Sequence, residues 1–275
     1  MIALFILITL INTALYAEEG KNRMPLIIAH RGASAHAPEN TLAAFKLAVN
    51  TGADAVELDV YQTKDQRLAV IHDKTLNRTT NGSGNVSDFT LDELKELDAG
   101  SWFDPKFKGE KIPALEEVID ALPDTTIIII ELKEGSHQSP GIEEDVIEII
   151  KKNKIADRVI LKSFNQEVLQ RLRKSAPEIP LCYVYAFRIP FLSIIVDKGV
   201  SFGSIFKINV EYLQPHRLLL SRSFVEKAHE CGYKVISWGV NSPRQIMQAI
   251  DYDVDGIETD YPNRVRMLLN KNFSD

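Results

Sequence analysis

From residue 26 onward, short runs of apolar and β-branched residues alternate with longer amphipathic stretches. Strands that alternate with helices are typical of βα units and a parallel sheet. The pattern predicts eight main strands, over residues 26–30, 55–60, 126–132, 159–163, 181–185, 204–209, 234–239 and 256–259. Helices are expected over residues 41–50, 115–122, 142–152, 166–175, 223–230, 243–250 and 263–269. Eight strands that alternate with helices favour a closed (β/α)8 TIM barrel over an open sheet.

One short apolar run does not fit this alternation. Residues 68–71 have a strand pattern but follow the second strand too closely for a helical crossover. We therefore expect them to return antiparallel and form a hairpin with that strand. A turn centred on Asp65 and Gln66 would place Asp59 opposite His72.

The hairpin is followed by a polar stretch that is too long for an ordinary loop. Residues 73–113 are rich in Asn, Gly, Asp and Thr, and we expect a small insert that covers the barrel mouth. Within it, Thr90 and Glu93 have the spacing of a capping box at a helix N-terminus. Because a barrel domain typically takes about 250 residues, residues 18–275 are predicted to form one domain with this insert.

Residues 1–17 are apolar and uncharged and are followed directly by Glu18 and Glu19. The run is shorter than the roughly 20 residues of a spanning helix, and Ala17 is a small residue suited to a cleavage site. The segment predicts a signal peptide and an exported protein, periplasmic or secreted, with no stable membrane span after cleavage. The segment lacks the positively charged N-terminal region that is usual in signal peptides, so membrane anchoring by an uncleaved segment remains an alternative.

The formal net charge is −6 and the pI is about 5.6, with acidic and basic residues interspersed along the chain. This distribution offers no extended basic surface, so nucleic acid is not an expected partner. A small anionic substrate would need a local cluster of basic groups. No feature of the pattern indicates an oligomeric state.

Acidic residues occur near the ends of two predicted strands, where reactive groups gather in barrels of this class. Glu57 and Asp59 are two residues apart, as are Glu131 and Lys133, so each pair lies on one side of its strand. Three converging carboxylates, Glu57, Asp59 and Glu131, would form a hard oxygen site suited to one divalent cation, Mg²⁺ or Ca²⁺.

Basic groups and histidines occur at the same strand ends. Arg31 can form paired hydrogen bonds with phosphate oxygens, and Lys133 can add a positive charge. His30 and His72 can accept and donate protons near neutral pH, as cleavage of a phosphodiester requires.

Several blocks of sequence resemble the glycerophosphodiester phosphodiesterase family in order and spacing. They are HRGASAHAPENTLAAF, GADAVELDVYQTKDQRLAVIHDKTLNRTTNGSG, IIIELK, SFN, SWGVN and DGIETDYP, and the resemblance covers nearly all of residues 26–262. The resemblance implies a metal-dependent enzyme that hydrolyses glycerophosphodiesters, which are small molecules, to sn-glycerol 3-phosphate and an alcohol.

The resemblance also implies a role for individual residues. It assigns acid–base catalysis to His30 and His72, metal binding to Glu57, Asp59 and Glu131, phosphate contacts to Arg31 and Lys133, support of the substrate site to Glu39 and Asn40, and the glycerol pocket to Trp238. Of the two histidines, we favour His72 as the acid and His30 as the base. Glu39 and Asn40 have an alternative interpretation, as part of a helix N-cap with Thr41.

Two positions depart from the family pattern. Gln66 stands where the hairpin turn usually has Gly, and Gly239 stands where Thr usually follows the tryptophan. The first makes the predicted hairpin register less secure, and the second affects the expected contacts with glycerol.

Two alternative functions differ in substrate or in class. One is a lysophospholipase D-type phosphodiesterase of the same superfamily, because Trp102, Phe103 and Phe107 in the insert could face a lipid. The other is an exported binding protein that keeps the barrel without turnover, which the complete set of catalytic positions argues against.

Overall fold

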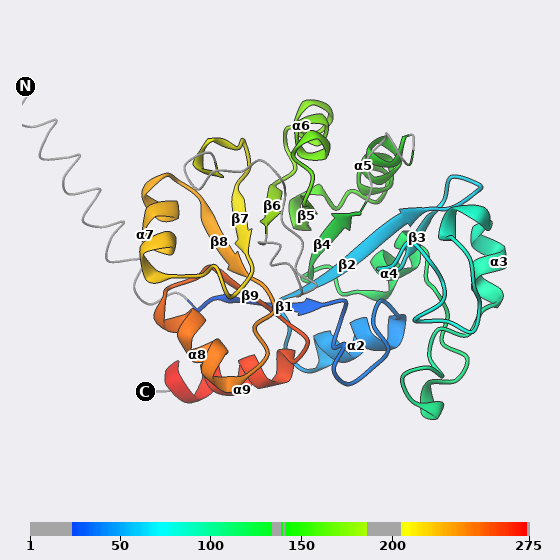
Figure 1. Ribbon diagram of the computed structural model, residues 1–275, viewed down its shortest axis with the longest axis horizontal. Coiled ribbons are helices and arrows are strands. Elements are labelled where there is room, and N and C mark those ends of the chain that lie inside the picture. The colour runs from blue at the N-terminus through cyan, green and yellow to red at the C-terminus, as the bar shows by residue number, and fades with distance from the viewer. Residues whose placement is uncertain (1–23, 134–138, 140, 186–204, 274–275) are drawn as a thin grey trace, which may run out of the picture.

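The structure is a computed structural model that describes residues 24–133, 139, 141–185 and 205–273 (Figure 1). Its centre is a nine-stranded sheet in the order β1-β9-β8-β7-β6-β5-β4-β2-β3, closed into a barrel by a further pairing of β1 with β2. The strands are β1 (Leu26–His30), β2 (Ala55–Gln62), β3 (Leu68–Val70), β4 (Ile127–Leu132), β5 (Val159–Ser163), β6 (Leu181–Tyr185), β7 (Tyr212–Pro215), β8 (Lys234–Ser237) and β9 (Gly256–Thr259). Eight of these strands pair in parallel and β3 returns antiparallel on β2. The predicted TIM barrel is therefore confirmed.

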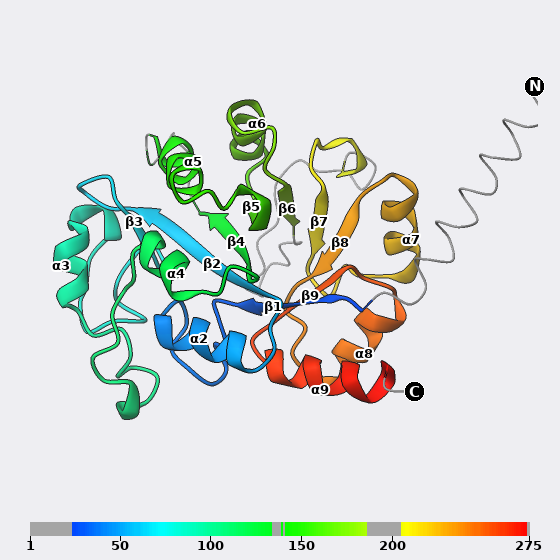
Figure 2. The same ribbon diagram turned by 180° about the vertical axis from the view of Figure 1, so that it is seen from behind.

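Helices surround the barrel, as the two opposite views of Figures 1 and 2 show. They are α2 (Leu42–Asn50), α4 (Leu115–Ala121), α5 (Ile142–Asn153), α6 (Gln166–Ser175), α7 (Arg222–Glu230), α8 (Pro243–Asp251) and α9 (Pro262–Phe273), with α3 (Leu91–Glu96) in the insert. Short 3-10 helices are η1 (Val86–Asp88), η2 (Pro105–Phe107), η3 (Ala156–Arg158) and η4 (Ile205–Lys207). The outward strand residues, such as Val56 and Ile128, join the main core with helix residues such as Phe45 and Val118.

The residues that point into the barrel form two layers. The layer near the amino ends of the strands is apolar and contains Ile28, Ala55, Ile129, Ile160, Cys182 and Ile236. Two residues further along β2, β4 and β5, the buried side chains are the charged Glu57, Glu131 and Lys162, and β7 and β9 add the buried Gln214 and Glu258. Because strand side chains alternate in direction, both layers face the interior, one above the other. We call them the apolar layer and the charged layer.

The prediction of a strand over residues 204–209 is wrong. The described part of that segment forms η4, and the seventh barrel strand is β7, at Tyr212–Pro215. The buried inward residue of β7 is the polar Gln214, so the strand has no apolar run to reveal it. Ile205 belongs instead to the main core, which accounts for the apolar pattern of the preceding segment.

The hairpin is confirmed, but its predicted register is wrong by one residue. Val60 pairs with Val70, and Asp59 lies opposite Ile71, whose N–H donates to the Asp59 carbonyl at 3.0 Å. The reason is a three-residue turn in place of the two-residue turn expected. Its last residue, Gln66, has φ +60°, a left-handed conformation that explains why glycine is common at this position.

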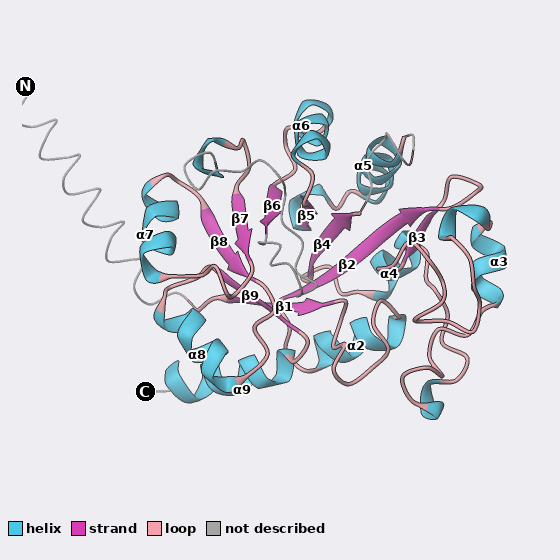
Figure 3. Cartoon of the chain, viewed as in Figure 1, coloured by secondary structure: helices cyan, strands magenta, loops and turns pink. Residues whose placement is uncertain are grey.

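The insert packs beside β3 and the end of β2, at the right of Figure 3. It has its own small core, made of residues that include Ile71, Leu76, Leu91 and Ile112. The capping box predicted at its helix is confirmed, because α3 begins after Thr90 with both reciprocal hydrogen bonds to Glu93. Within the described residues, no helix is long and apolar enough to cross a membrane. The predicted signal segment, residues 1–17, lies outside them.

Candidate active site

A pocket of about 660 Å³ opens where the carboxyl ends of the barrel strands meet. Its walls come from most of the strands and from the start of the insert. They are formed by His30, Arg31, Tyr61, His72, Asp73, Lys74, Glu131, Lys133, Lys162, Phe164, Val184, Trp238 and Glu258. Among the residues predicted from the sequence, both histidines, both basic groups and the tryptophan therefore border one cavity.

The three predicted metal ligands come together beside this pocket, and Glu131 is the one that lines it. Glu57, Asp59 and Glu131 each offer a carboxylate oxygen, and these oxygens lie within 4.8 Å of one another. The parallel register of β2 and β4 pairs Asp59 with Glu131 directly. All three side chains are buried, with exposed fractions of 0%, 1% and 4% in chain order. Converging carboxylate oxygens are the ligands that hard divalent cations prefer in proteins.

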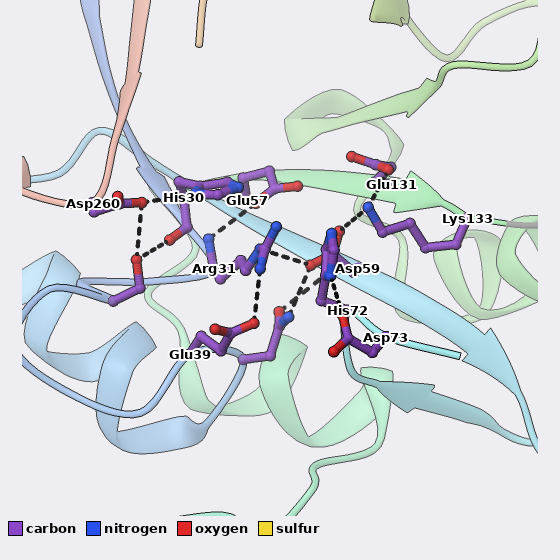
Figure 4. Close-up of polar contacts among 12 residues, drawn as sticks. His30, Arg31, Glu39, Glu57, Asp59, His72, Asp73, Glu131, Lys133 and Asp260 are labelled. Carbon is purple, nitrogen blue, oxygen red and sulfur yellow. Dashed lines mark hydrogen bonds and ion pairs between the residues drawn. The ribbon is translucent and has the colours of Figure 1, made fainter. Parts of the chain in front are cut away.

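Two basic side chains flank two of these carboxylates (Figure 4). Lys133 Nζ lies 3.0 Å from Asp59 Oδ1 and 2.5 Å from Glu131 Oε1. Arg31 Nε lies 3.4 Å from Asp59 Oδ2. Burial alone would raise the pKa of Asp59, but the positive charges of Lys133 and Arg31 outweigh it and lower the pKa. Asp59 is therefore ionised, as a metal ligand must be.

Glu57 is in a different electrostatic environment. Burial raises the pKa of Glu57 to about 7, and the charges of Asp59 and Glu258 add to this effect while Lys162 opposes it. The basic groups of the chain thus leave Glu57 only partly compensated at neutral pH. A divalent cation would supply the missing positive charge, so the electrostatics of this trio, as well as its oxygen donors, fit such an ion.

His30 is held in place by the aspartate of the DGIETDYP block. Its Nδ1 lies 2.7 Å from Asp260 Oδ1, and Asp260 is fixed in turn by a hydrogen bond from Asn241 Nδ2 at 2.6 Å. Burial and Arg31 lower the pKa of His30, but the bond to Asp260 and the charges of Glu57 and Glu258 raise it by more. The pKa of His30 is therefore above its ordinary value.

His72 has the same kind of support from the other side of the pocket. Its Nδ1 lies 2.6 Å from Asp73 Oδ1, and Asp73 also accepts a 2.6 Å hydrogen bond from Arg78. Burial is the largest influence and lowers the pKa of His72, and Lys133 and Arg31 add to it. Asp59 and Asp73 oppose this effect without overcoming it, so the pKa of His72 lies below its ordinary value.

The charges around the two histidines therefore favour a proton on His30 over one on His72. This order is opposite to the assignment favoured from the sequence, where His72 was the acid. It applies to the chain without a cation, because a positive ion beside Glu57 would remove part of the field that raises the pKa of His30.

Glu39 and Asn40 support the site from below without lining the pocket. Asn40 Nδ2 donates to Asp59 Oδ2 at 2.8 Å, from a left-handed backbone conformation with φ +57°. Glu39 accepts a hydrogen bond from Arg31 at 2.8 Å and a paired contact from Arg78. The helix N-cap is the following residue, Thr41, whose hydroxyl accepts from the backbone of α2. Glu39 thus orients Arg31, the candidate for phosphate binding, and Asn40 orients Asp59, a candidate metal ligand.

Trp238 lies at the end of β8 on the wall of the pocket and packs edge-on against Phe164 and His216. Its indole N–H is buried and has no hydrogen-bond partner among the residues that the structure describes. The neighbouring Gly239 has φ +74°, and a Cβ there would lie 3.1 Å from His216 Nε2. The departure from threonine at this position therefore has a steric cause.

Sequence analysis did not identify four charged residues that take part in the site. Asp73 and Asp260 orient the histidines, while Lys162 and Glu258 face each other inside the barrel. Each of the last two is the one charged residue of a short buried strand. A charged residue in such a strand was the available signal, as it was for Glu57 and Asp59 on β2.

A model of the glycerophosphoryl diester phosphodiesterase family matches residues 30–264 of this chain. The chain is 41% identical over 247 residues to a glycerophosphodiester phosphodiesterase from Caldanaerobacter subterraneus subsp. tengcongensis, covering 90% of this chain and 98% of that protein. It is 30% identical over 280 residues to a lysophospholipase D from Mus musculus, covering 90% and 86% of the two chains.

The fold gives a matching result. A phosphodiesterase from Oleispira antarctica, solved in complex with the product sn-glycerol-3-phosphate, superposes with a TM-score of 0.80 at 29% identity. The match covers 90% of this chain and 97% of that one. With the family model covering most of the sequence and a relative at 41% identity over nearly its full length, the chain belongs to the glycerophosphoryl diester phosphodiesterase family.

Proposed function

We propose that the protein hydrolyses glycerophosphodiesters to sn-glycerol 3-phosphate and an alcohol, with a divalent cation, Ca²⁺ or Mg²⁺, at Glu57, Asp59 and Glu131. The observation that carries the proposal is the convergence of these three carboxylates beside a pocket that Glu131 lines together with the two histidines. When bound, the cation supplies stabilisation of the negative charge that develops on the phosphoryl group.

Arg31 and Lys133 are proposed to bind the phosphate. Both line the pocket, and both are already oriented by carboxylates, Arg31 by Glu39 at 2.8 Å and Lys133 by Asp59 at 3.0 Å. Lysine and arginine held in this way need little reorganisation to receive an anion. The two cations would interact with the substrate phosphate as well as with these carboxylates. This local positive charge explains how a protein with a net negative charge can bind a phosphodiester.

His30 and His72 are proposed to transfer the protons. In each, an aspartate accepts the Nδ1–H, which leaves Nε2 to take or give a proton at the substrate. One histidine removes the proton of the attacking hydroxyl, which is either water or the glycerol 2-hydroxyl in a route through a cyclic phosphate. The other histidine protonates the leaving alcohol.

Trp238 is proposed to bind the glycerol half of the substrate. Trp238 lines the pocket, and its buried indole N–H has no hydrogen-bond partner within the described residues. The complex of the Oleispira antarctica phosphodiesterase with sn-glycerol-3-phosphate supports a product of this kind for the same fold.

Product identification tests this proposal. Metal-stripped enzyme should leave glycerophosphocholine intact, and adding Mg²⁺ or Ca²⁺ should start the release of sn-glycerol 3-phosphate and choline, followed by ³¹P nuclear magnetic resonance. Asp59→Asn serves as the matched control, because it removes one charge from the carboxylate trio without changing its size. Release of phosphocholine and glycerol, or full activity in excess EDTA, would contradict the proposal.

A lysophospholipase D activity is the second candidate, supported by the relative of that name from Mus musculus. The aromatic residues of the insert do not favour it. Phe103 makes edge-on ring contacts with Trp102 and Phe107, and none of the three lines the pocket, although Trp102 is 39% exposed. A side-by-side assay of glycerophosphocholine and lysophosphatidylcholine separates the two functions, and no turnover of either would support the binding-protein alternative.

We also propose that the protein is exported and that residues 1–17 are removed. The support is the uncharged apolar run that ends in Ala17, directly before Glu18. Mass spectrometry of the mature protein should find its N-terminus at or near Glu18. A protein recovered inside the cell with residues 1–17 intact would contradict export.

A further inference from the structure

Lys162 is a buried cation beside two of the proposed metal ligands. It projects from β5 into the charged layer and is 2% exposed. Its Nζ lies 2.8 Å from Glu57 Oε1, 3.1 Å from Glu258 Oε2 and 3.4 Å from Glu131 Oε2. Three carboxylates from three strands thus surround one ammonium group, two of them from the proposed metal site.

The residues around Lys162 are themselves fixed by hydrogen bonds. Gln214 Nε2 donates to Glu258 Oε2 at 2.7 Å, and the Cys182 thiol donates to Gln214 Oε1 at 3.4 Å. These bonds set the orientation of the Gln214 amide and, through it, that of Glu258. Burying charges is costly unless geometry and hydrogen bonds are good, and here each charged group of the cluster has a partner.

The same residues contain a second set of potential metal ligands. His30, Glu57 and Glu258 each offer a ligand atom within 4.8 Å of the others, and Glu57 also belongs to the first set. Two ligand sets that share a carboxylate are the arrangement of two-metal hydrolases, in which the ions lie about 3.5–4 Å apart. In this chain, the Lys162 ammonium contacts two of the three members of the second set.

We propose that Lys162 fills the place of a second divalent cation, so that the enzyme binds a single metal ion, at Glu57, Asp59 and Glu131. The inference rests on the metal dependence proposed above. Lys162 supplies a permanent positive charge beside Glu57 and Glu131 and acts as a positioning residue for them. Because this cation is covalently tethered, it does not depend on the metal concentration.

Counting bound Mn²⁺ tests the proposal without using activity. Metal-stripped enzyme is equilibrated with Mn²⁺, the bound ions are counted by elemental analysis, and electron paramagnetic resonance (EPR) distinguishes single ions from coupled pairs. Wild type should bind about one Mn²⁺ per chain with a single-ion spectrum. Lys162→Met, which keeps the length of the side chain but not its charge, should bind about two, coupled through Glu57.

Two further variants make the result specific to the second site. Lys162→Met combined with Glu258→Met removes a ligand of the second set and should return the count to about one. Lys95→Met is the matched control, since Lys95 of the insert also forms a close ion pair, with Glu117 at 2.5 Å, away from the proposed metal site. This control should bind Mn²⁺ like the wild type.

The outcomes separate this proposal from the proposed function. No Mn²⁺ bound to wild type would contradict metal dependence itself. Two ions in wild type, or one ion with an unchanged spectrum in a folded Lys162→Met variant, would overturn the role of Lys162. If Lys162→Met does not fold, the Mn²⁺ spectra of the wild type and of the double variant test the proposal. Coupled Mn²⁺ pairs in either protein would also overturn the role of Lys162.

Discussion

The apolar layer and the charged layer of the barrel interior lie two residues apart on β2, β4 and β5. Ile129 belongs to the first and Glu131 to the second, both on β4, and Ile160 and Lys162 have the same relation on β5. The backbone and the direction of the side chains are alike in the two layers, so the difference lies in chemistry alone. Residues expected to stabilise the barrel and residues expected to serve its chemistry are therefore two positions apart on the same face of a strand.

The two layers make opposite contributions to folding. Burying an apolar side chain such as Ile129 stabilises a protein by about 1.5–3 kcal/mol. Burying a charge costs several kcal/mol before its partners compensate it, and the pKa of about 7 for Glu57 shows that compensation here is incomplete. The presence of a destabilising charged layer next to the pocket is best explained by a role of these residues in metal binding and catalysis.

The largest expected effect is the loss of the carboxylate trio. Replacing Asp59 by Ala should lower kcat/KM by at least about 10³-fold, because the cation supplies several kcal/mol of charge stabilisation. Titrating the variant with Mg²⁺ and Ca²⁺ in the steady-state assay checks this, and millimolar metal should not restore activity. An Asp59→Ala enzyme within tenfold of wild type would place the metal elsewhere.

Removing either histidine should have the next largest effect. His30→Ala and His72→Ala should each lower kcat by about 10²-fold or more with the fold intact, since positioned proton transfer contributes that much. Circular dichroism verifies folding, and steady-state kinetics with glycerophosphocholine gives kcat. Normal turnover in one variant would exclude that histidine from proton transfer.

The same variants can identify the acid. A p-nitrophenyl diester of glycerol phosphate has a leaving group that needs no protonation, so it should restore much of the lost rate in the acid variant only. The charges around His30 predict that His30→Ala is the restored variant. Restoration of His72→Ala alone would instead support the assignment made from the sequence.

The substrate preference should follow from the contacts on the glycerol phosphate half. Glycerophosphocholine, glycerophosphoethanolamine and glycerophosphoglycerol should have kcat/KM values within about tenfold, because Arg31, Lys133 and Trp238 are expected to contact the half that they share. Lysophosphatidylcholine should react at least about 10²-fold more slowly, because its acyl group leaves a buried hydroxyl site unpaired. A faster lysolipid would make lysophospholipase D the better description.

A smaller effect is expected on stability as a function of pH. Because the pKa of Glu57 is raised from 4.5 to about 7, its protonated form stabilises the metal-free fold below pH 4.5, and this contribution is lost as pH rises through 7. Glu57→Gln has no carboxyl group to deprotonate, so its stability should not fall in this pH range. Measured by urea unfolding in EDTA, the variant should have a larger unfolding free energy than the wild type, by roughly 1–3 kcal/mol at pH 8 and by less at pH 5. Parallel pH profiles would exclude this role of Glu57.

Sequence patterns predicted the barrel and the grouping of the candidate residues at its strand ends, for a physical reason, while the family resemblance supplied their proposed roles. Strand ends such as His30 and the Glu57 and Asp59 pair carry polar residues at a spacing of two, and parallel strands bring such ends together. The errors arose where this signal fails. The polar Gln214 concealed β7, and the extra residue in the turn at Gln66 shifted the hairpin. Lys162 was missed because its partners come from strands that are distant in sequence.

One matched pair on β4 tests most directly the assignment of stability to the apolar layer and of function to the charged layer. Ile129→Ala should lower the unfolding free energy by about 2–5 kcal/mol while kcat/KM at 25 °C stays within about fivefold of wild type. Glu131→Gln, two residues along on the same face, should remain folded at 25 °C and lose at least about 10³-fold in kcat/KM. Near-wild-type activity in Glu131→Gln, or a comparable loss of activity in a fully folded Ile129→Ala enzyme, would contradict it.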